Sequence, residues 1–571
     1  MSSAQSYIFH PREITLPIFS VQTNDKYLND KEIGLFANNN SKEDKKTHDW
    51  RRPVMIEFFP VGSDNSAFNQ LGETRIQGGQ SRSNALKSMV FYANKRFNPD
   101  QKRYSYEFFP DQKPGITEFK SFSLRDGGND FGDLYFRDLI IQRRMAGHVD
   151  LDWQAGHSAV LYINGEYMGM LNIRERSNED NIYSNYNGLE DIDMVEISHE
   201  QENGQDMFIE EFKGSEDATF YNAFKAFYSE KGHTKAEYEQ WMDVSEYLNI
   251  MIMNLFYGNI DFPGNNIVFW RPNDDDTESG LPKIWRFIVK DTDFGLGLYG
   301  RQNTYNTIDL LYHPENHQGD AWAFTEPATR LIKNMLEDKD ILDMFIDKCC
   351  VYMGDFMNGK GTGETIDLIK AESMEEFVAH RDKYNPGWGG WWAPDNRTEI
   401  ENKFNAAKQW AEGRPNNFYN HIGKKWNLGT AFPVTLNKGI ADMPEDVTIN
   451  GIKLSEGVFD GKLFPNRQLT ITATAPEGKT IAGWKVTTTP ASGSKKTENY
   501  DGDELVLTPA SCKSMSIEAI FSIGSGISEK KAECNDDVKA IYNLRGERQQ
   551  SLSSGINIVV YGNGEARKVV R

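Results

Sequence analysis

The sequence predicts an α+β domain followed by a small all-β domain, and three observations support this fold class. Short β-rich runs with glycine-containing turns fill most of residues 53–175. Apolar residues then recur with helical periodicity over 206–258 and over much of 324–424, which is typical of amphipathic helices. Beyond residue 433 the chain is rich in Thr, Val and Ile with regularly spaced turns, a pattern that favours a β-sandwich.

Length and composition limit the function. The chain has 571 residues, more than one hydrophobic core ordinarily holds, so we expect several domains. A formal net charge of −21 argues against nucleic-acid partners and anionic membrane surfaces. No run of about 20 apolar residues occurs, so no membrane span is expected. Zinc-binding Cys/His patterns and the H-E-x-x-H and G-x-S-x-G motifs are absent from the sequence.

The predicted domain boundaries follow the changes in composition. An N-terminal extended segment covers residues 1–50, and the α+β domain covers 51–430. The all-β sandwich-like domain covers 433–522. A short β-rich segment occupies 538–571, after a linker that contains Gly and Ser.

The first candidate site is a glycine-rich loop. A strand is predicted from residue 53, and the segment 73–93 reads as strand, glycine turn, polar loop and strand. Consecutive glycines let backbone N–H groups approach an anion closely, and the loop adds hydroxyl and guanidinium donors. A lysine at the start of the second strand can reach the same anion; the alternative is an ordinary β-turn with a surface lysine. The candidate anion-binding residues are Gly78, Gly79, Ser81, Arg82 and Lys87.

Two further residues belong to the candidate phosphate site. Strands are predicted at 104–109 and up to Arg125, which is either a phosphate contact or part of a structural ion pair. A helix is predicted at 133–146. The clearest hairpin, HSAVLYINGEYMGMLNIRER, has an Asn-Gly type I′ turn and ends at Glu175. In protein kinases a glutamate orients the phosphate-binding lysine, so Glu175 is a candidate partner for Lys87, and a structural carboxylate is the alternative.

The strongest signal lies at 259–297. Two β-rich runs, 267–271 and 284–289, flank an acidic loop that contains Gly and Pro, which predicts a hairpin. The residues before the first strand and after the second strand of a hairpin lie side by side. Carboxylate and amide oxygens that meet there are suited to a divalent cation. The residues expected to converge are Asp261, Asn266, Asp291 and Asp293.

The spacing of these residues matches two protein-kinase motifs. Asp261 and Asn266 form D-x-x-x-x-N, and Asp293 begins D-F-G. Protein kinases have a catalytic-loop Asp, a metal-binding Asn and the D-F-G Asp in this order. Each motif alone is weak, but both in order and joined by a predicted hairpin are much stronger. The alternative is a pair of acidic loops that caps strand ends.

Helical patterns resume after the acidic hairpin, at 324–357, 365–381 and 397–424. Between them the segment GWGGWW, residues 387–392, carries three tryptophans. They either stack on a sugar or peptide or pack a loop onto the core.

Residues 14–430 resemble the CotH family of spore-coat-associated atypical protein kinases. The resemblance rests on TRIQGGQSRSNALKS, FSLRDGGND, VLYINGEYMGMLNIRE, NIDFPGNN and FIVKDTDFG. It implies a diverged protein-kinase-like fold with a β-rich N-terminal part and a helical C-terminal part. It also implies that the protein uses ATP and a divalent metal to phosphorylate proteins.

Carried over by position, the resemblance implies that Lys87 contacts the ATP phosphates and that Asp261 is the catalytic carboxylate. Asn266, Asp291 and Asp293 would then hold Mg²⁺ or Mn²⁺. The family often has D-x-D a few residues before F-G, whereas Phe-Gly follows Asp293 directly here. Which of Asp291 and Asp293 is the principal ligand therefore stays open.

The segment from residue 538 resembles the type IX secretion sorting domains that Bacteroidetes-type bacteria attach to exported proteins. This resemblance rests on IYNLRGERQQSLSSGINIVVYGNGEARKVV and implies a secreted or cell-surface protein. The N-terminus lacks the hydrophobic region of a signal peptide, so we expect that a signal peptide is missing from the sequence.

The favoured interpretation is ATP- and Mg²⁺-dependent phosphotransfer to Ser/Thr side chains of an unidentified protein substrate. Two alternatives stay open: a surface or structural binding module built on an inactive kinase-like fold, and transfer of AMP rather than phosphate. The all-β domain is a candidate contact for carbohydrate or the cell envelope.

Overall fold

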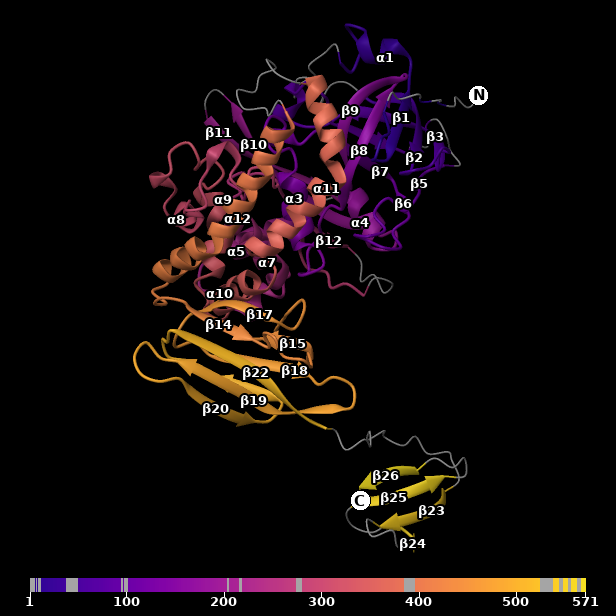
Figure 1. The fold of residues 1–571 in the computed structure, drawn as a ribbon. Helices are drawn as coiled ribbons and strands as arrows, with labels where there is room; N and C mark the ends of the chain where they lie inside the picture. The colour runs from indigo at the N-terminus through magenta and orange to yellow at the C-terminus, as the bar shows by residue number, and fades with distance from the viewer. Residues whose placement is uncertain are drawn as a thin grey trace. The chain divides into compact units, whose positions relative to one another are not determined.

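A computed structural model gives the fold, and two compact units, Met1–Ala431 and Phe432–Arg571, divide the chain. Each unit is described by itself, and Figure 1 shows the path of the chain. The segment GWGGWW, the linker after residue 523 and the acidic loop at 274–279 lie outside the described residues. The structure describes residues 6, 8, 12–36, 50–93, 96, 101–202, 205–214, 218–273, 280–384, 396–523, 538–543, 548–552, 556–561 and 566–570.

Seven strands of the first unit close into a barrel in the order β1-β2-β3-β4-β7-β9-β8. Neighbouring strands are antiparallel except β1 and β8, which run parallel with Ile18 opposite Val160. The predicted α+β class is confirmed, but closure of the N-terminal strands into a barrel was not predicted. The strands are β1 Ile18–Gln22, β2 Arg52–Phe59, β3 Phe68–Ile76, β4 Met89–Tyr92, β7 Ser121–Arg125, β8 Gly156–Ile163 and β9 Glu166–Arg174.

Aromatic side chains fill the barrel. The ring of Phe108 lies 5.4 Å from that of Phe58 and 5.3 Å from that of Phe122, measured between centroids. The strand expected at 104–109 is therefore wrong beyond its first two residues, because Phe108 and Phe109 are buried as core side chains rather than paired in a sheet. The short pair that does form is β5 Tyr104–Ser105 with β6 Glu118–Phe119.

The hairpin between β8 and β9 is present as predicted. Asn164 and Gly165 at its turn have φ values of 50° and 83°, which is the conformation that a type I′ turn requires. The turn places β8 and β9 side by side, with Ile163 opposite Glu166.

A second sheet has the order β11-β10-β12-β13. The predicted hairpin of β12 and β13 is confirmed, with Val268 opposite Ile288. The helix expected from residue 206 is wrong at its start, because Gln205–Lys213 pairs with β10. An Asn-Gly dipeptide at 203–204, between two alternating runs, is the sequence signal that indicates this hairpin. The strands are β10 Ile192–Glu202, β11 Gln205–Lys213, β12 Ile267–Pro272 and β13 Arg286–Ile288.

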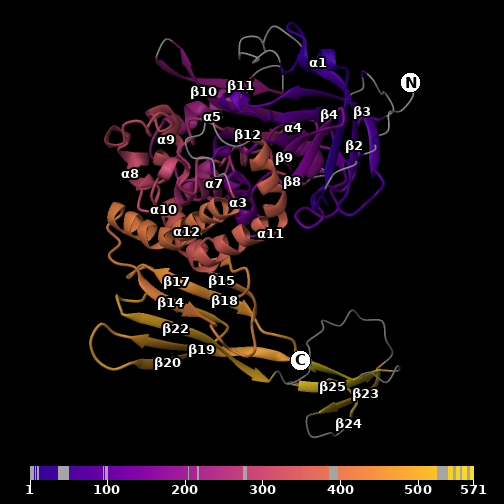
Figure 2. The ribbon, with the colours of Figure 1, turned by 45° about the horizontal axis from the view of Figure 1, so that its top comes forward.

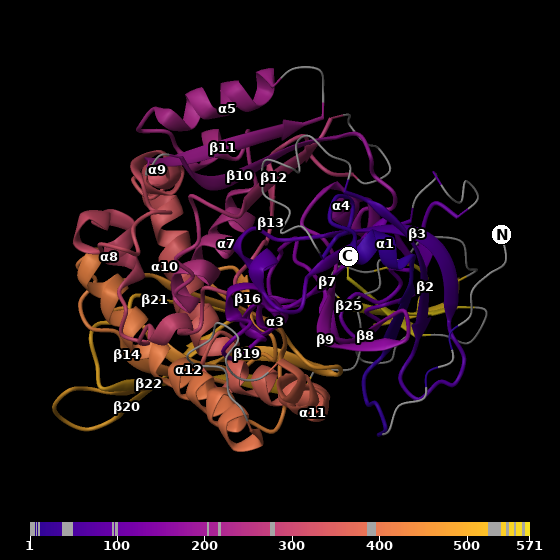
Figure 3. The ribbon, with the colours of Figure 1, turned by 90° about the horizontal axis from the view of Figure 1, so that it is seen from above.

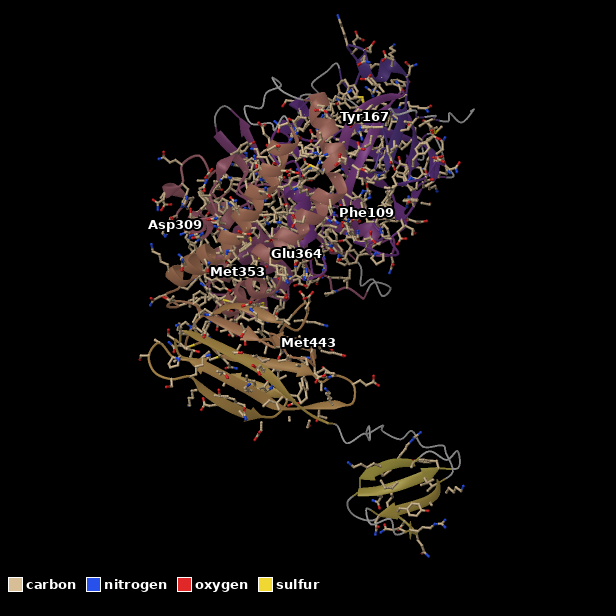
Figure 4. All side chains as sticks on the ribbon, viewed as in Figure 1. Phe109, Tyr167, Asp309, Met353, Glu364 and Met443 are labelled. Atoms are coloured by element: carbon tan, nitrogen blue, oxygen red, sulfur yellow. The ribbon has the colours of Figure 1, made fainter. Side chains whose placement is uncertain are left out.

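Helices make up most of the remaining first unit. Figure 1 shows the barrel on one side of the unit and the helices on the other, and Figure 4 places Phe109 and Tyr167 on the barrel side and Asp309 and Met353 on the helical side. No helix in the described residues is both long and apolar enough to span a bilayer. The helices are α1 Asp25–Asn29, α3 Arg137–Met145, α4 Glu179–Asn185, α5 Thr219–Ser229, α6 Lys235–Tyr238, α7 Val244–Tyr257, α8 Thr307–Tyr312, α9 Glu326–Met335, α10 Lys339–Asp355, α11 Gly359–Tyr384 and α12 Arg397–Lys425.

Helices α4 and α5 and the buried helix α7 position the second sheet. Seen from above, α5 lies along β11, and Lys225 of α5 pairs with Glu210 of β11 at 2.5 Å (Figure 3). Helix α4 lies between the barrel and this sheet (Figures 2 and 3), and its Ile182 packs into the core formed by β10 and β12. The C-terminal end of α7 leads directly to the β12–β13 hairpin.

The second unit consists of sheets. Residues 432–523 form a five-stranded sheet, β17-β14-β22-β19-β20, and a four-stranded sheet, β16-β15-β18-β21, with β19 packed against β18 and β21. A four-stranded sheet, β24-β23-β25-β26, follows. The strands are β14 Phe432–Leu436, β15 Glu445–Ile449, β16 Ile452–Lys453, β17 Phe459–Leu463, β18 Leu469–Thr474, β19 Lys479–Thr489, β20 Lys496–Asp501, β21 Glu504–Leu507, β22 Ser514–Ile523, β23 Val538–Asn543, β24 Arg548–Gln549, β25 Ile556–Tyr561 and β26 Ala566–Val570.

Candidate functional site

The β12–β13 hairpin brings acidic residues from two parts of the chain to one place. Its antiparallel register means that the segment before β12 and the segment after β13 run side by side. The side-chain amide of Asn259 donates to the main-chain carbonyl of Asp291 at 3.3 Å and ties the two segments together. Burial raises the pKa of Asp261, and Asp291 lies close enough for its negative charge to raise that pKa further.

Asp261 is a buried carboxylate, 5% exposed, that three asparagines hold in place. The side-chain amides of Asn265 and Asn266 donate to its Oδ1 at 2.8 Å and its Oδ2 at 2.7 Å. Its backbone N–H donates to Oδ1 of Asn259 at 3.1 Å. Asn259 follows the end of α7, where Gly258 adopts a left-handed conformation with φ 72°. The end of a buried helix thus fixes this carboxylate.

The surroundings of Asp261 make it a proton acceptor near neutral pH. Burial, followed by the charge of Asp291, raises its pKa from 3.8 to about 7, and the hydrogen bonds from Asn265 and Asn266 act in the opposite direction. A carboxyl group with a pKa near the working pH is suited to accept a proton from a substrate hydroxyl.

Asp291 and Asp293 share one guanidinium group. Nη2 of Arg125 lies 2.9 Å from Oδ2 of Asp293 and also contacts Oδ1 of Asp291. Asp293 is fully buried and accepts a further hydrogen bond from the backbone N–H of Asn129 at 2.9 Å. Burial, followed by the charge of Asp291, raises the pKa of Asp293 well above its ordinary value. The side chain of Asp291 is 25% exposed, so solvent reaches the pair through Asp291.

A buried ion pair behind this cluster escaped the sequence analysis. Asp138 of α3 accepts hydrogen bonds from Nη1 of Arg174 at 2.6 Å and from the backbone N–H of Thr292 at 2.9 Å. Although burial opposes ionisation of Asp138, Arg174 and Arg125 hold its pKa well below the usual range. Asp138 therefore holds Thr292 between the two aspartates of the D-T-D sequence. No local sequence pattern marks Asp138, because its partners come from β9 and from the segment after β13.

The glycine-rich loop is held by its own arginine and lysine. Nε of Arg82 donates to the carbonyl of Gly78 at 2.6 Å, and Nζ of Lys87 donates to the carbonyl of Arg82 at 2.6 Å. Gly78 has φ 107°, and a Cβ atom there would lie 2.2 Å from Oγ of Ser81, which explains the glycine. Gly79 precedes the 3₁₀ turn Gln80–Ser83.

Lys87 lies two residues before β4 rather than on it, and it is partly buried. Burial lowers its pKa, while the negative charge of Asp126 opposes this change. Lys87 thus carries a partly desolvated ammonium group beside the glycine-rich loop.

The turn after β7 connects the glycine-rich loop to the acidic cluster. The side-chain amide of Asn84 donates to Oδ2 of Asp126 at 2.9 Å and to the carbonyl of Gly128 at 3.1 Å. Gly128 has φ 66°, and a Cβ atom there would lie 2.2 Å from Oδ2 of Asp293. Because Asn129 also bonds Asp293, the loop and the acidic cluster are linked through one short segment. The two candidate regions therefore belong to one site.

Comparison with known proteins identifies the family of the chain. The family model described as CotH kinase protein matches residues 74–418. The chain belongs to the CotH kinase family. The match begins in β3, includes the glycine-rich loop, Arg125 and the β12–β13 hairpin, and ends in α12. A search of curated proteins finds no match.

One expected contact of this CotH kinase family member is not formed. Glu175 pairs with Nζ of Lys113 at 2.5 Å, not with Lys87, and is 2% exposed. The strand registers explain why Glu175 does not reach Lys87. Glu175 continues β9 to a position opposite Phe122 of β7, whereas Lys87 continues the line of β4 to a position opposite Asp126. Four residues along a strand separate the two positions by about 13 Å. Glu175 is the structural carboxylate that the sequence left as the alternative.

The other expected residues lie together. Asp261, Asn266, Asp291 and Asp293 are at the hairpin end, and Arg125 pairs with two of the carboxylates, which is the ion-pair alternative left open by the sequence. Within the described ranges, no group of three or more His, Cys, Asp or Glu side chains is arranged to hold a metal ion.

The donor set nevertheless fits a hard cation in its chemistry. Asp291 and Asp293 supply carboxylate oxygens on either side of one positive group, the guanidinium of Arg125. Burial, and then the negative charge of Asp291, raise the pKa of the Asp293 carboxyl group despite its contact with Arg125. A divalent cation would offset that charge, and the exposed side of Asp291 offers the approach.

Proposed function

We propose that the protein transfers the γ-phosphate of ATP to a hydroxyl group of a protein side chain with the help of Mg²⁺ or Mn²⁺. The observation that carries this proposal is the joining of three parts into one site. These parts are the glycine-rich loop with Lys87, the near-neutral carboxyl group of Asp261, and the pair Asp291 and Asp293. Membership of the CotH kinase family supports the same reaction class.

In the proposed reaction, Asp261 orients the acceptor hydroxyl group and takes its proton on a carboxylate oxygen. Its amide partners Asn265 and Asn266 hold the carboxylate in one orientation. A pKa of about 7 lets Asp261 be ionised in a large fraction of molecules at neutral pH and still accept a proton.

Asp291 and Asp293 would hold the metal ion, which when bound neutralises charge on the β- and γ-phosphates. Arg125 contacts both carboxylates, so its guanidinium has to give up at least one of these contacts to a cation. Asn129 keeps its hydrogen bond to Asp293 and fixes that carboxylate against the turn after β7. Asn266 would contribute the amide oxygen expected of the metal-binding asparagine.

The glycine-rich loop would bind the phosphates. Lys87 is partly buried with a lowered pKa, and a nearby phosphate group compensates for the cost of burying its charge. Arg82 uses Nε and Nη2 to hold the carbonyls of Gly78 and Ile76, so we assign it a role in shaping the loop.

Intact-mass spectrometry tests the proposal. The full chain is incubated with ATP and Mg²⁺ or Mn²⁺, alone and with candidate acceptor proteins, beside the variants Asp261→Asn and Asp293→Asn. The matched control is Asp111→Asn, an exposed aspartate in the turn after residue 109. We expect a phosphate-sized mass increase with the native protein and the control, and none with either site variant.

The other possible outcomes distinguish phosphotransfer from the alternatives. An increase the size of AMP keeps the site but replaces phosphotransfer with nucleotidyl transfer. No mass increase, together with no effect of ATP and metal on the melting temperature, contradicts both reactions.

A further inference from the structure

A cavity of about 450 Å³ in the first unit lies at the far end of the barrel strands from the acidic cluster. Tyr92 lines it and lies opposite Ser121, whereas the other ends of the same strands carry Met89 opposite Leu124. Three residues along β4 span about 10 Å, and Lys87 lies beyond Met89. The cavity is therefore separate from the glycine-rich loop.

The cavity lining is positively charged, although the protein as a whole is negatively charged. Seven of its 13 lining residues are Lys or Arg and three are acidic, which leaves a local excess of four positive charges. The whole chain carries a formal charge of −21. A concave basic surface on an acidic protein concentrates anions and repels cations.

Three of the arginines surround one tyrosine ring. The guanidinium carbons of Arg51, Arg176 and Arg75 lie 4.1, 5.5 and 5.9 Å from the centre of the Tyr92 ring. Nε of Arg75 also donates to the hydroxyl oxygen of Tyr92 at 3.0 Å. Like charges that share one ring repel one another, and an anion among them removes that repulsion.

Of the three acidic side chains at the cavity, Asp180 is mostly buried and lies 3.6 Å from Arg176, whereas the two glutamates are exposed. Glu190 is 60% exposed and pairs with Lys120 and, at 3.5 Å, with Arg103. Glu179 is 48% exposed and lies 3.6 Å from Lys213. Ion pairs this exposed are worth little, so a ligand can compete for the same cations.

We propose that this cavity binds a phosphate-bearing anion at a site independent of the nucleotide site. Four of its seven cations are arginines, whose planar groups donate two hydrogen bonds to a phosphate in fixed geometry. The volume lies in the range of small-ligand pockets, roughly 300–1,000 Å³. Two sources share this chemistry: a small diphosphate-type molecule and a phosphorylated side chain of a protein.

Isothermal titration calorimetry in metal-free buffer tests the site with inorganic pyrophosphate as the probe. The cavity variant is Arg51→Gln with Arg176→Gln, and the single variant Arg51→Gln, at an exposed position, guards against misfolding. Arg330→Gln is the matched control, because it removes an arginine of α9 that pairs with an exposed glutamate, Glu326. Lys87→Gln reports on the nucleotide site.

We expect pyrophosphate to bind the double variant at least tenfold more weakly than the native protein, with a smaller loss for Arg51→Gln and none for Arg330→Gln or Lys87→Gln. Weaker binding to Lys87→Gln but not to the cavity variants overturns the proposal, since the probe then occupies the glycine-rich loop. Absence of pyrophosphate binding, or equal losses in the cavity variants and Arg330→Gln, also overturns it.

A competition arm separates the two sources. A phosphoserine peptide that displaces pyrophosphate, while its unphosphorylated twin does not, assigns the site to phosphorylated protein side chains. Failure of both peptides in the presence of measurable pyrophosphate binding assigns it to a small molecule. This result is independent of phosphotransfer, because Asp261 and Asp293 take no part in the cavity.

Discussion

Replacing Asp261 with asparagine is expected to stabilise the metal-free protein at pH 8, and to do so by less at pH 5. The pKa of Asp261 is about 7 in the folded protein, against 3.8 ordinarily. The folded state therefore binds this proton more tightly than the unfolded state does. The free energy of unfolding then falls as the pH rises from about 4 to about 7. Asparagine at position 261 carries no charge, so this decrease in the free energy of unfolding is absent from the variant.

The size of the effect follows from the same environment. The difference between about 7 and 3.8 corresponds to an upper limit of about 4 kcal/mol, at 1.36 kcal/mol for each pKa unit. Rearranged hydrogen bonds reduce this gain. Oδ1 of Asn265 already accepts from the backbone N–H of His199 at 2.9 Å, so Asn265 keeps its donor toward position 261. Asn266 has to turn its amide to face the new NH₂ group. We expect a gain of about 1–3 kcal/mol at pH 8.

Differential scanning calorimetry in EDTA at pH 5 and pH 8 measures the effect, with Asp111→Asn as the exposed control. The variant should melt at a higher temperature than the native protein at pH 8, and this difference in melting temperature should be smaller at pH 5. An equal difference at both pH values would refute the reasoning, because it would mean that Asp261 titrates outside this range.

The other predictions concern the contacts around the same site. Arg125→Met should lower the free energy of unfolding of the metal-free protein by about 3–5 kcal/mol, because the buried Asp293 loses its cationic partner. Excess Mn²⁺ should restore much of this stability. Equal Mn²⁺-induced shifts of the melting temperature in the native protein and the variant would contradict this prediction. Lys113→Met should cost a similar amount because Glu175 stays buried without its partner, and adding Glu175→Gln should recover part of the loss in calorimetry. Gly78→Ala should raise the KM for ATP about tenfold, through backbone strain of about 1–3 kcal/mol, whereas Gly79→Ala, at a negative φ with open space, should change it less; equal effects would argue against the strained turn.

The hairpin end of the site could be predicted because its geometry is local. Asp261 and Asp293 are about thirty residues apart, and one turn between two short strands is enough to bring their segments together. The glycine-rich loop was also predictable, since Gly78 has a conformation that favours glycine. In both places the chemistry-bearing residues lie next to the element that positions them.

The remaining contacts depend on pairings between distant strands. Glu175 was expected beside Lys87, but the offset of β4 and β9 along β7 places it beside Lys113. Asp138 and Arg174 are 36 residues apart and meet only because α3 packs behind the barrel. No periodicity or motif in the sequence encodes such a register. The structure was therefore needed to find the Asp138–Arg174 ion pair and to show that Glu175 pairs with Lys113.

Closure of the barrel by β1 has a consequence for how the chain can be divided. Val21 of β1 lies opposite Ile163 of β8, so the last seam joins segments more than 140 residues apart. The family match starts inside β3 and leaves β1 and β2 out. A fragment limited to residues 74–418 would expose unpaired backbone N–H and C=O groups along β3 and β8, and such open edges recruit other chains. Soluble production of the region that matches the family should therefore require the chain from before Ile18.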